Sequence, residues 1–150
     1  ERDLAPIEAG KAEVIQWGAD GTILCCGTLL AECIGAAQLL KEECNLDIGV
    51  VNARFVKPID RDIIRRAIGE TGFLVTVEES ALMTGFGSAV LETANEMNLD
   101  TRRVRRLGVP DEFVLFAERG ELLAELGLDA TGIFKTCREM TGERVESDVI

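Results

Sequence analysis

Histidine is absent from the 150-residue chain, and this absence constrains its chemistry more than any other feature of its composition. A chain without histidine has no Ser-His or Cys-His nucleophile pair and no imidazole acid or base. It also lacks every zinc motif that combines cysteine with histidine. We therefore expect neither a hydrolytic triad nor a mixed zinc site in this chain.

Long apolar runs and positive charge are also scarce. No run approaches the roughly 20 residues that cross a bilayer, and the N-terminal stretch ERDLAPIEAGK has no apolar segment behind a basic start. Lysine and arginine number 16 against 27 acidic residues, and the resulting formal net charge of -11 repels nucleic acid and anionic lipid. We expect a soluble cytoplasmic protein whose partners include no nucleic acid and no membrane.

Paired cysteines are not indicated either, because the sequence has five, at positions 25, 26, 33, 44 and 137. An odd number that falls mostly within apolar or helical patterns is typical of reduced packing residues in a cytosolic protein. The neighbours Cys25 and Cys26 lie in an apolar run, which favours packing over a redox or metal role.

A chain of this length with 47% apolar residues fits one domain with a substantial core. The chain begins Glu-Arg-Asp without a methionine, which is typical of a piece cut from a longer protein. We predict a domain over residues 1–140 and a polar tail over residues 141–150 that frays.

Strand-like and helix-like patterns alternate along the chain. Strands are predicted at residues 14–17, 22–26, 47–53, 73–77 and 101–107. Amphipathic helices are predicted after Thr28, after Asp60, over residues 86–97 and 119–126, and at about 129–140. Apolar strands that alternate with such helices indicate a parallel sheet covered on both faces.

The first two strands flank Gly18-Ala19-Asp20-Gly21, and Asp-Gly is typical of a tight hairpin turn. This predicts one antiparallel pair in an otherwise parallel sheet. The predicted fold class is therefore α/β, a three-layer α/β/α sandwich with a mostly parallel five-stranded sheet and one antiparallel edge strand.

The stretch EESALMTGFGSAVLE, residues 78–92, resembles a phosphate-binding loop because two glycines stand just before a helical pattern. Gly85 and Gly87 provide only the first two glycines of a dinucleotide fingerprint, since Val90 occupies the third position. The glycines more often allow close approach of backbone, although an anion could use the free amides at this helix start.

Glu78 and Glu79 follow the fourth predicted strand, where open α/β sheets place functional groups. Two carboxylates could act as acid and base, but neighbours in an extended segment point to opposite sides. An ion pair or an interface contact is therefore the favoured interpretation. The arginines at 102, 103, 105 and 106 could bind phosphate, but more often such a cluster protects an edge strand from pairing with other chains.

Four stretches carry a family resemblance: GTLLAECIGAAQLL, VVNARFVKPID, LVTVEESALMTGFGSAVLE and RRLGVPDEFVLFAERGELLAELGLDATGI. In this order and spacing they resemble the C-terminal domain of the 1-deoxy-D-xylulose-5-phosphate synthases, which are transketolase-like enzymes. The resemblance covers residues 7–140, and the last stretch separates these synthases from other transketolase-like families. Residues 102–106, with four arginines, depart from the small apolar strand that is usual there.

The resemblance implies a parent enzyme that condenses pyruvate with glyceraldehyde 3-phosphate, releases carbon dioxide and feeds isoprenoid synthesis. It implies thiamine diphosphate and Mg²⁺ bound by two preceding domains, and a homodimer in the cytoplasm or, for a plant or alga, the plastid. For this chain it implies a scaffold with no catalytic, cofactor-binding or metal-binding residue and no activity when isolated.

The same resemblance implies interdomain or dimer contacts at five residues of the loop: Glu78, Glu79, Met83, Gly85 and Gly87. Valine at both glycines is then expected to weaken dimerisation or domain docking. Two alternatives stay open, namely the domain of a 2-oxoacid dehydrogenase beta subunit and a stand-alone module that binds a phosphorylated ligand at the helix start.

Overall fold

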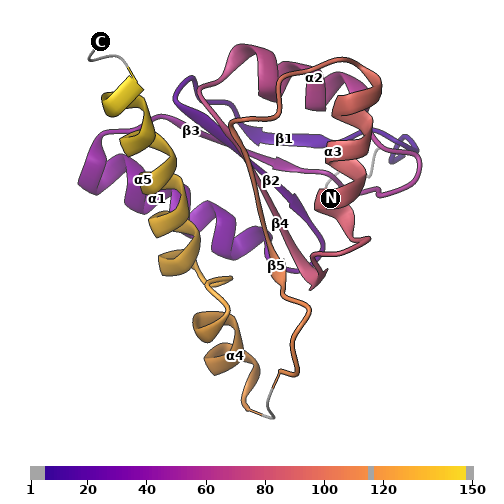
Figure 1. Ribbon diagram of the computed structural model, residues 1–150. Coiled ribbons are helices and arrows are strands. Elements are labelled where there is room, and N and C mark those ends of the chain that lie inside the picture. Colours follow the sequence, from indigo (N-terminus) through magenta and orange to yellow (C-terminus); the bar gives the residue numbers. More distant parts are fainter. Residues whose placement is uncertain (1–5, 115–116, 148–150) are drawn as a thin grey trace.

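The computed structural model describes residues 6–114 and 117–147, with the side chains of residues 143–147 left out (Figure 1). The strands are β1 (Glu13–Gln16), β2 (Gly21–Cys26), β3 (Ile48–Asn52), β4 (Leu74–Ala81) and β5 (Val104–Val109). The helices are α1 (Leu30–Cys44), α2 (Arg61–Glu70), α3 (Phe86–Glu96), α4 (Arg119–Glu125) and α5 (Ala130–Ser147). None of the helices described is long and apolar enough to span a membrane.

The five strands form one sheet in the order β1-β3-β2-β4-β5. All neighbours are parallel except β1, which runs antiparallel to β3 at the edge. Helices α1, α4 and α5 cover one face and helices α2 and α3 cover the other (Figure 1). The predicted three-layer α/β fold with one antiparallel edge strand is confirmed.

Strand β4 shows how the sheet divides its side chains between two cores. Leu74 packs into the core beneath α2 and α3, whereas Val75 and Val77 pack into the core beneath α1 and α5. Because successive side chains of a strand alternate between faces, Glu78 continues the first row and Glu79 the second. The strand thus delivers two neighbouring carboxylates to opposite sides of the sheet.

The predicted hairpin is wrong, although the prediction of a single antiparallel strand is right. β1 pairs with β3 rather than with β2, so the segment between β1 and β2 crosses the start of β3. Asp20 holds this crossing, because its backbone N–H donates to the carbonyl of Asp47 and its carboxylate accepts from the amide of Asp47. Gly18 packs so closely on Asp47 that a Cβ would overlap its carbonyl oxygen.

The helix starts agree with the sequence at one place and differ at another. Asp60 caps α2 as predicted, since its Oδ1 accepts from the amides of Asp62 and Ile63 at 3.2 Å. Thr28 does not cap α1, because that helix begins at Leu30 and the Thr28 hydroxyl donates instead to Glu79.

Two elements are longer than the hydrophobic pattern predicts. β4 continues through Glu78 and Glu79 to Ala81, so the loop before α3 is shorter than expected. α5 continues to Ser147 and takes in most of the segment predicted to fray, while residues 148–150 lie outside the described residues. The proposed domain boundary at residue 140 stays a prediction.

The arginines of residues 102–106 serve contacts within the chain. Arg103 donates to the carbonyls of Gly72 and Met140, and Arg106 donates to the carbonyl of Leu82 at 2.7 Å. These bonds tie β5, which is an edge strand, and the residue just before it to the segments before and after β4 and to α5. Long side chains thus stabilise an edge that is only partly buried.

Candidate functional site at the carboxyl edge of the sheet

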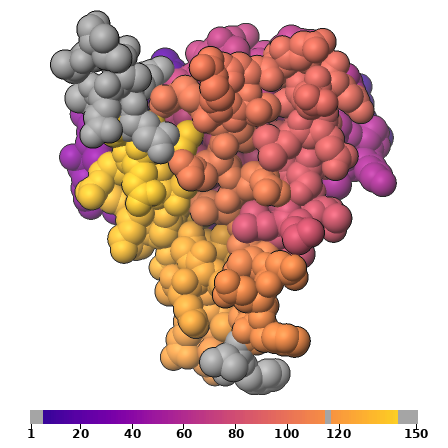
Figure 2. All heavy atoms as spheres, in the orientation of Figure 1, coloured from indigo at the N-terminus to yellow at the C-terminus, as the bar shows by residue number. Residues whose placement is uncertain are grey.

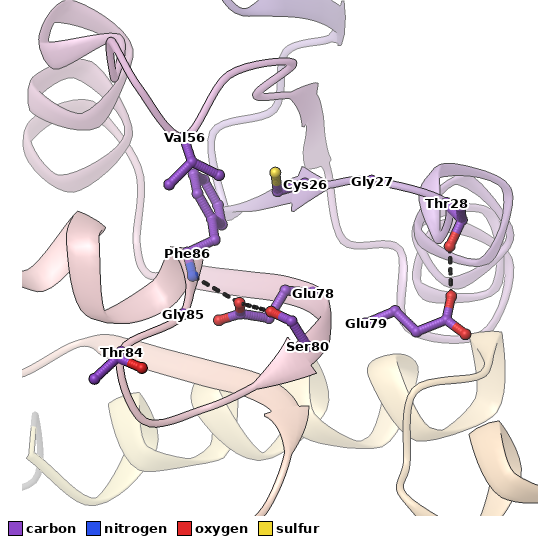
Figure 3. Close-up of a pocket in the computed structure, with 10 residues that line it drawn as sticks. All are labelled: Cys26, Gly27, Thr28, Val56, Glu78, Glu79, Ser80, Thr84, Gly85 and Phe86. Carbon is purple, nitrogen blue, oxygen red and sulfur yellow. Dashed lines mark hydrogen bonds between the residues drawn. The ribbon is translucent and has the colours of Figure 1, made fainter.

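An open hollow of about 570 Å³ lies where β2 and β4 end and α3 begins (Figure 3). The lining comes from the end of β2, the loop after β3, the end of β4 and the first residues of α3. Its residues are Cys26, Gly27, Thr28, Val56, Glu78, Glu79, Ser80, Thr84, Gly85 and Phe86. This is the edge at which parallel α/β sheets most often bind ligands.

The carboxylate of Glu78 is buried, since the residue as a whole is only 2% exposed. Its oxygens accept from the backbone amides of Phe86 at 2.6 Å and Gly87 at 2.8 Å, and also from the hydroxyl of Ser80 (Figure 3). These amides belong to the first turn of α3, where the helix dipole favours a negative charge. The helix start that could have taken an external anion is therefore occupied by an anion of the chain itself.

The two glycines of this loop allow the close approach that Glu78 requires. A Cβ at Gly85 would overlap both the Glu78 carboxylate and the carbonyl oxygen of Ala81. A Cβ at Gly87 would lie 2.7 Å from the Thr76 hydroxyl oxygen and 2.9 Å from Cδ of Arg106. The structure thus accounts for both glycines through packing inside the chain.

Glu79 lies on the other side of the sheet and forms an ion pair with Arg119 at the start of α4. Its Oε1 accepts from Arg119 Nε at 2.9 Å and its Oε2 from Arg119 Nη2 at 2.6 Å, an arrangement in which both oxygens are engaged. Thr28 also donates to Glu79 (Figure 3). The hydrogen bond from Arg119 and then that from Thr28 lower the pKa of Glu79 below its ordinary value of 4.5.

We expect the Glu79–Arg119 pair to contribute stability only above acidic pH. Because the pKa of Glu79 is lower in the folded chain, the contribution is complete above the unfolded pKa of about 4.5 and is lost as pH falls through the folded pKa. In Arg119→Ala, the pKa of Glu79 should rise toward its ordinary value in an NMR titration of the side-chain carboxyl.

Arg138→Ala is the matched control for this titration, because Arg138 lies on α5 and stacks on Phe134 instead. Its removal should leave the Glu79 titration unchanged. An identical Glu79 titration in wild type and Arg119→Ala would contradict the pair.

The loop between β4 and α3 is held firmly but presents an apolar side chain outward. The carbonyl of Leu82 accepts from the hydroxyl of Ser88 and from Arg106, and the Leu82 amide donates to Val109. Met83, the next residue, is 62% exposed. Thr84 adopts φ = 61°, which is uncommon for a branched residue. A fixed loop with an exposed Met is suited to contact with another surface.

The hollow has little catalytic capacity. Burial raises the pKa of the Cys26 thiol, with smaller contributions from its neighbours Cys25 and Glu78, so Cys26 stays protonated and weakly nucleophilic. Within residues 6–114 and 117–147 no cluster of three or more candidate ligands could hold a metal ion. With the α3 amides already bound to Glu78, these residues do not fit a diphosphate cofactor with its magnesium.

The five residues predicted from the sequence as contacts do not form one surface. Glu78, Gly85 and Gly87 are committed to each other inside the chain, whereas Met83 and part of Glu79 face outward. Sequence reasoning missed Thr28 and Arg119 as partners of Glu79. Arg119 is separated from Glu79 by 40 positions, and no local pattern signals a contact at that distance.

Comparison with known proteins gives a consistent result. The family model for the transketolase C-terminal domain matches residues 10–133. A 1-deoxy-D-xylulose-5-phosphate synthase of Rhodopirellula baltica is 51% identical over 93% of this chain and 22% of its own length. One of Geobacter metallireducens is 46% identical over 89% of this chain and 21% of its length. The chain thus spans about a fifth of the curated relatives that it matches.

Solved structures agree on the fold. A chain described as a split-gene transketolase, inactive beta4 tetramer, superposes with a TM-score of 0.79 at 32% identity, over 93% of this chain and 44% of that one. A transketolase from Leishmania mexicana has a TM-score of 0.65 at 20% identity, over 89% of this chain and 18% of that one, which speaks for the fold alone. The chain therefore belongs to the transketolase C-terminal domain family, and the resemblance of its motifs to the 1-deoxy-D-xylulose-5-phosphate synthases is confirmed.

Proposed function

We propose that this chain is the C-terminal domain of a 1-deoxy-D-xylulose-5-phosphate synthase. The complete protein condenses pyruvate with glyceraldehyde 3-phosphate, releases carbon dioxide and supplies a precursor for isoprenoid and thiamine synthesis. The observation that carries this proposal is 51% identity to a protein of that name over 93% of the chain. A cytoplasmic location, in keeping with the bacterial relatives, is part of the proposal.

The role of this domain is to support the rest of the enzyme rather than to catalyse. The two carboxylates at the carboxyl edge of its sheet are committed, Glu78 to the start of α3 and Glu79 to Arg119. Thiamine diphosphate and Mg²⁺ are bound by the parts of the protein that precede this chain. The relatives, which are several times longer than their matched segments, support the existence of such parts.

Contacts with those parts, or with a second copy in a homodimer, involve the outward loop before α3. Met83 and the exposed edge of Glu79 are available for such contacts. Glu78, Gly85 and Gly87 act on the contact indirectly, because they fix the shape of the loop. The alternative of a stand-alone phosphate-binding module is disfavoured by the carboxylate that already occupies the α3 amides.

An activity assay on the complete gene product tests the proposal. Carbon dioxide should be released from pyruvate only when glyceraldehyde 3-phosphate, thiamine diphosphate and Mg²⁺ are all present. Residues 1–150 expressed alone should release none. Carbon dioxide release that is independent of glyceraldehyde 3-phosphate would instead favour the dehydrogenase beta-subunit alternative, and no release under any condition would overturn the synthase assignment.

A further inference from the structure

The segment after β5 projects from the body of the domain as a narrow extension (Figures 1 and 2). We call residues 110–128 the arm, of which the structure describes 110–114 and 117–128. The arm contains α4, and its C-terminal end joins α5 through Gly127 and Leu128. It is attached to the sheet edge by the ion pair between Arg119 and Glu79.

An apolar groove of about 280 Å³ runs between the arm and the end of β5. Leu123 and Leu128 are buried at its base and belong to the core beneath α1 and α5. Val109, Val114, Leu122 and Leu126 form its walls, and Glu79 and Arg119 stand at its rim. The groove is therefore an opening in the hydrophobic core.

Two large apolar side chains of the arm face solvent. Phe113 is fully exposed, at 103% of the reference area, and Val114 is 42% exposed. Phe113 does not line the groove, but it precedes Val114, which does. Single exposed apolar residues are common on protein surfaces, but a fully exposed aromatic residue in the same short segment as a groove-lining residue is typical of a contact surface. A partner that covers Phe113 and enters the groove would remove both from water.

The groove suits a protein side chain better than a small ligand. Its volume lies just below the range of about 300–1,000 Å³ that pockets for such ligands occupy. The polar groups at its rim, Glu79 and Arg119, are already bound to each other. Among the described lining residues, no other charged side chain remains to orient a small molecule.

The negative charge of the arm indicates what kind of surface it binds. The described part of the arm carries five exposed acidic residues and one arginine, and that arginine is bound to Glu79. The acidic residues are Asp111, Glu112, Glu118, Glu121 and Glu125. A second copy would bring an equally acidic arm, and like charges face to face are unfavourable. A surface with lysine or arginine around an apolar side chain complements both the acidic residues and the apolar groove of the arm.

We propose that the arm docks onto a segment of the same gene product outside residues 1–150, through an apolar side chain flanked by lysine or arginine. This inference rests on the proposed function, because only a longer polypeptide contains such a segment. Phe113 and the groove make the apolar contact, and the acidic residues of the arm meet the basic flank. The Glu79–Arg119 pair sets the arm in position beforehand, which lowers the entropic cost of docking.

Photo-crosslinking of the complete gene product tests the identity of the partner. Benzoylphenylalanine is placed at position 113, and the crosslinked peptide is identified by mass spectrometry. The same probe at Val14 is the control, since Val14 is 42% exposed on β1, at the opposite edge of the sheet. The proposal expects a crosslink from position 113, and not from position 14, to a lysine- or arginine-flanked apolar segment outside residues 1–150.

A crosslink confined to residues 1–150, of the same or a second copy, overturns the proposal, and so does a crosslink to an unrelated protein or none at all. The crosslink does not depend on catalysis, so carbon dioxide release by the same preparation reports separately on the proposed function. As a second measurement, Phe113→Ala should speed trypsin cleavage after Arg119 by about tenfold in the complete protein, whereas Val14→Ala should not. Equal cleavage in both variants and the wild type also overturns the proposal.

Discussion

Glu78→Ala should lower the free energy of unfolding of residues 1–150 by roughly 3 kcal/mol, because it leaves two buried helix amides without an acceptor. The amides of Phe86 and Gly87 have the Glu78 carboxylate as their partner, and Glu78 is only 2% exposed. Each unsatisfied buried donor costs about 1–3 kcal/mol, and the vacated space adds a further cost.

The measurement is urea unfolding followed by the fluorescence of Trp17, which is the single tryptophan of the sequence. Glu79→Ala is the matched control, since it removes the neighbouring carboxylate, whose ion pair with Arg119 is exposed to solvent and so contributes little. Glu78→Gln should fall between the two, because one acceptor oxygen remains but an amide group now faces a backbone N–H. Equal effects of the changes at positions 78 and 79 would show that Glu78 does not hold α3.

Gly85→Ala should also lower the free energy of unfolding, by roughly 3 kcal/mol, for a steric reason. The backbone of Gly85 has a φ of −83°, which any residue adopts, so the problem is space rather than conformation. The added methyl group would overlap the Ala81 carbonyl oxygen and the Glu78 carboxylate, and both are fixed by β4. The loop must move, and the amide bonds to Glu78 weaken with it.

Gly69→Ala should have the opposite effect on the free energy of unfolding. Gly69 lies within α2, and a Cβ there would meet nothing within 4 Å. Alanine at a helix position should raise the free energy of unfolding by about 0.5–1 kcal/mol. The pair of variants, compared by urea unfolding, separates the general effect of adding a methyl group from the special crowding at Gly85. A neutral Gly85→Ala would refute that crowding.

The crowding at Gly85 and Gly87 gives a second explanation for any effect of valine at these positions on dimerisation or domain docking. A loss of dimerisation or docking in the complete enzyme would follow from a distorted domain, even if neither glycine touches a partner. Met83→Ala is the cleaner probe of the contact itself, because its side chain is exposed and leaves the interior unchanged.

Local signals in the sequence were sufficient where the structure depends on local contacts. Asp60 caps the helix that its position predicts, and the apolar run before Asn52 forms the buried strand β3. The opposite directions of Glu78 and Glu79 also follow from strand geometry alone. The favoured interpretation of an ion pair holds for Glu79, and Glu78 pairs with amides instead.

The errors concern contacts that a local pattern cannot contain. The chain bends at Ala19 and Asp20, but whether the next strand pairs with β1 depends on β3, which enters between them. Thr28 had a plausible partner in the following helix, yet its hydroxyl bonds to Glu79 from a distant strand. In each case two sets of hydrogen bonds compete, one within a short segment of the chain and one with a distant segment. The packing of the whole sheet determines which of them forms.

The pairing of β1 with β3 also sets an order of events during synthesis. Glu13 and Val14 pair with Asn52 and Val51, so β1 leaves the ribosome well before the strand that receives it. At about 5–20 residues per second, translation supplies β3 some seconds later. Until then Val14 and Ile15, which stay partly exposed even in the finished fold, lack the strand beside which they lie in the sheet.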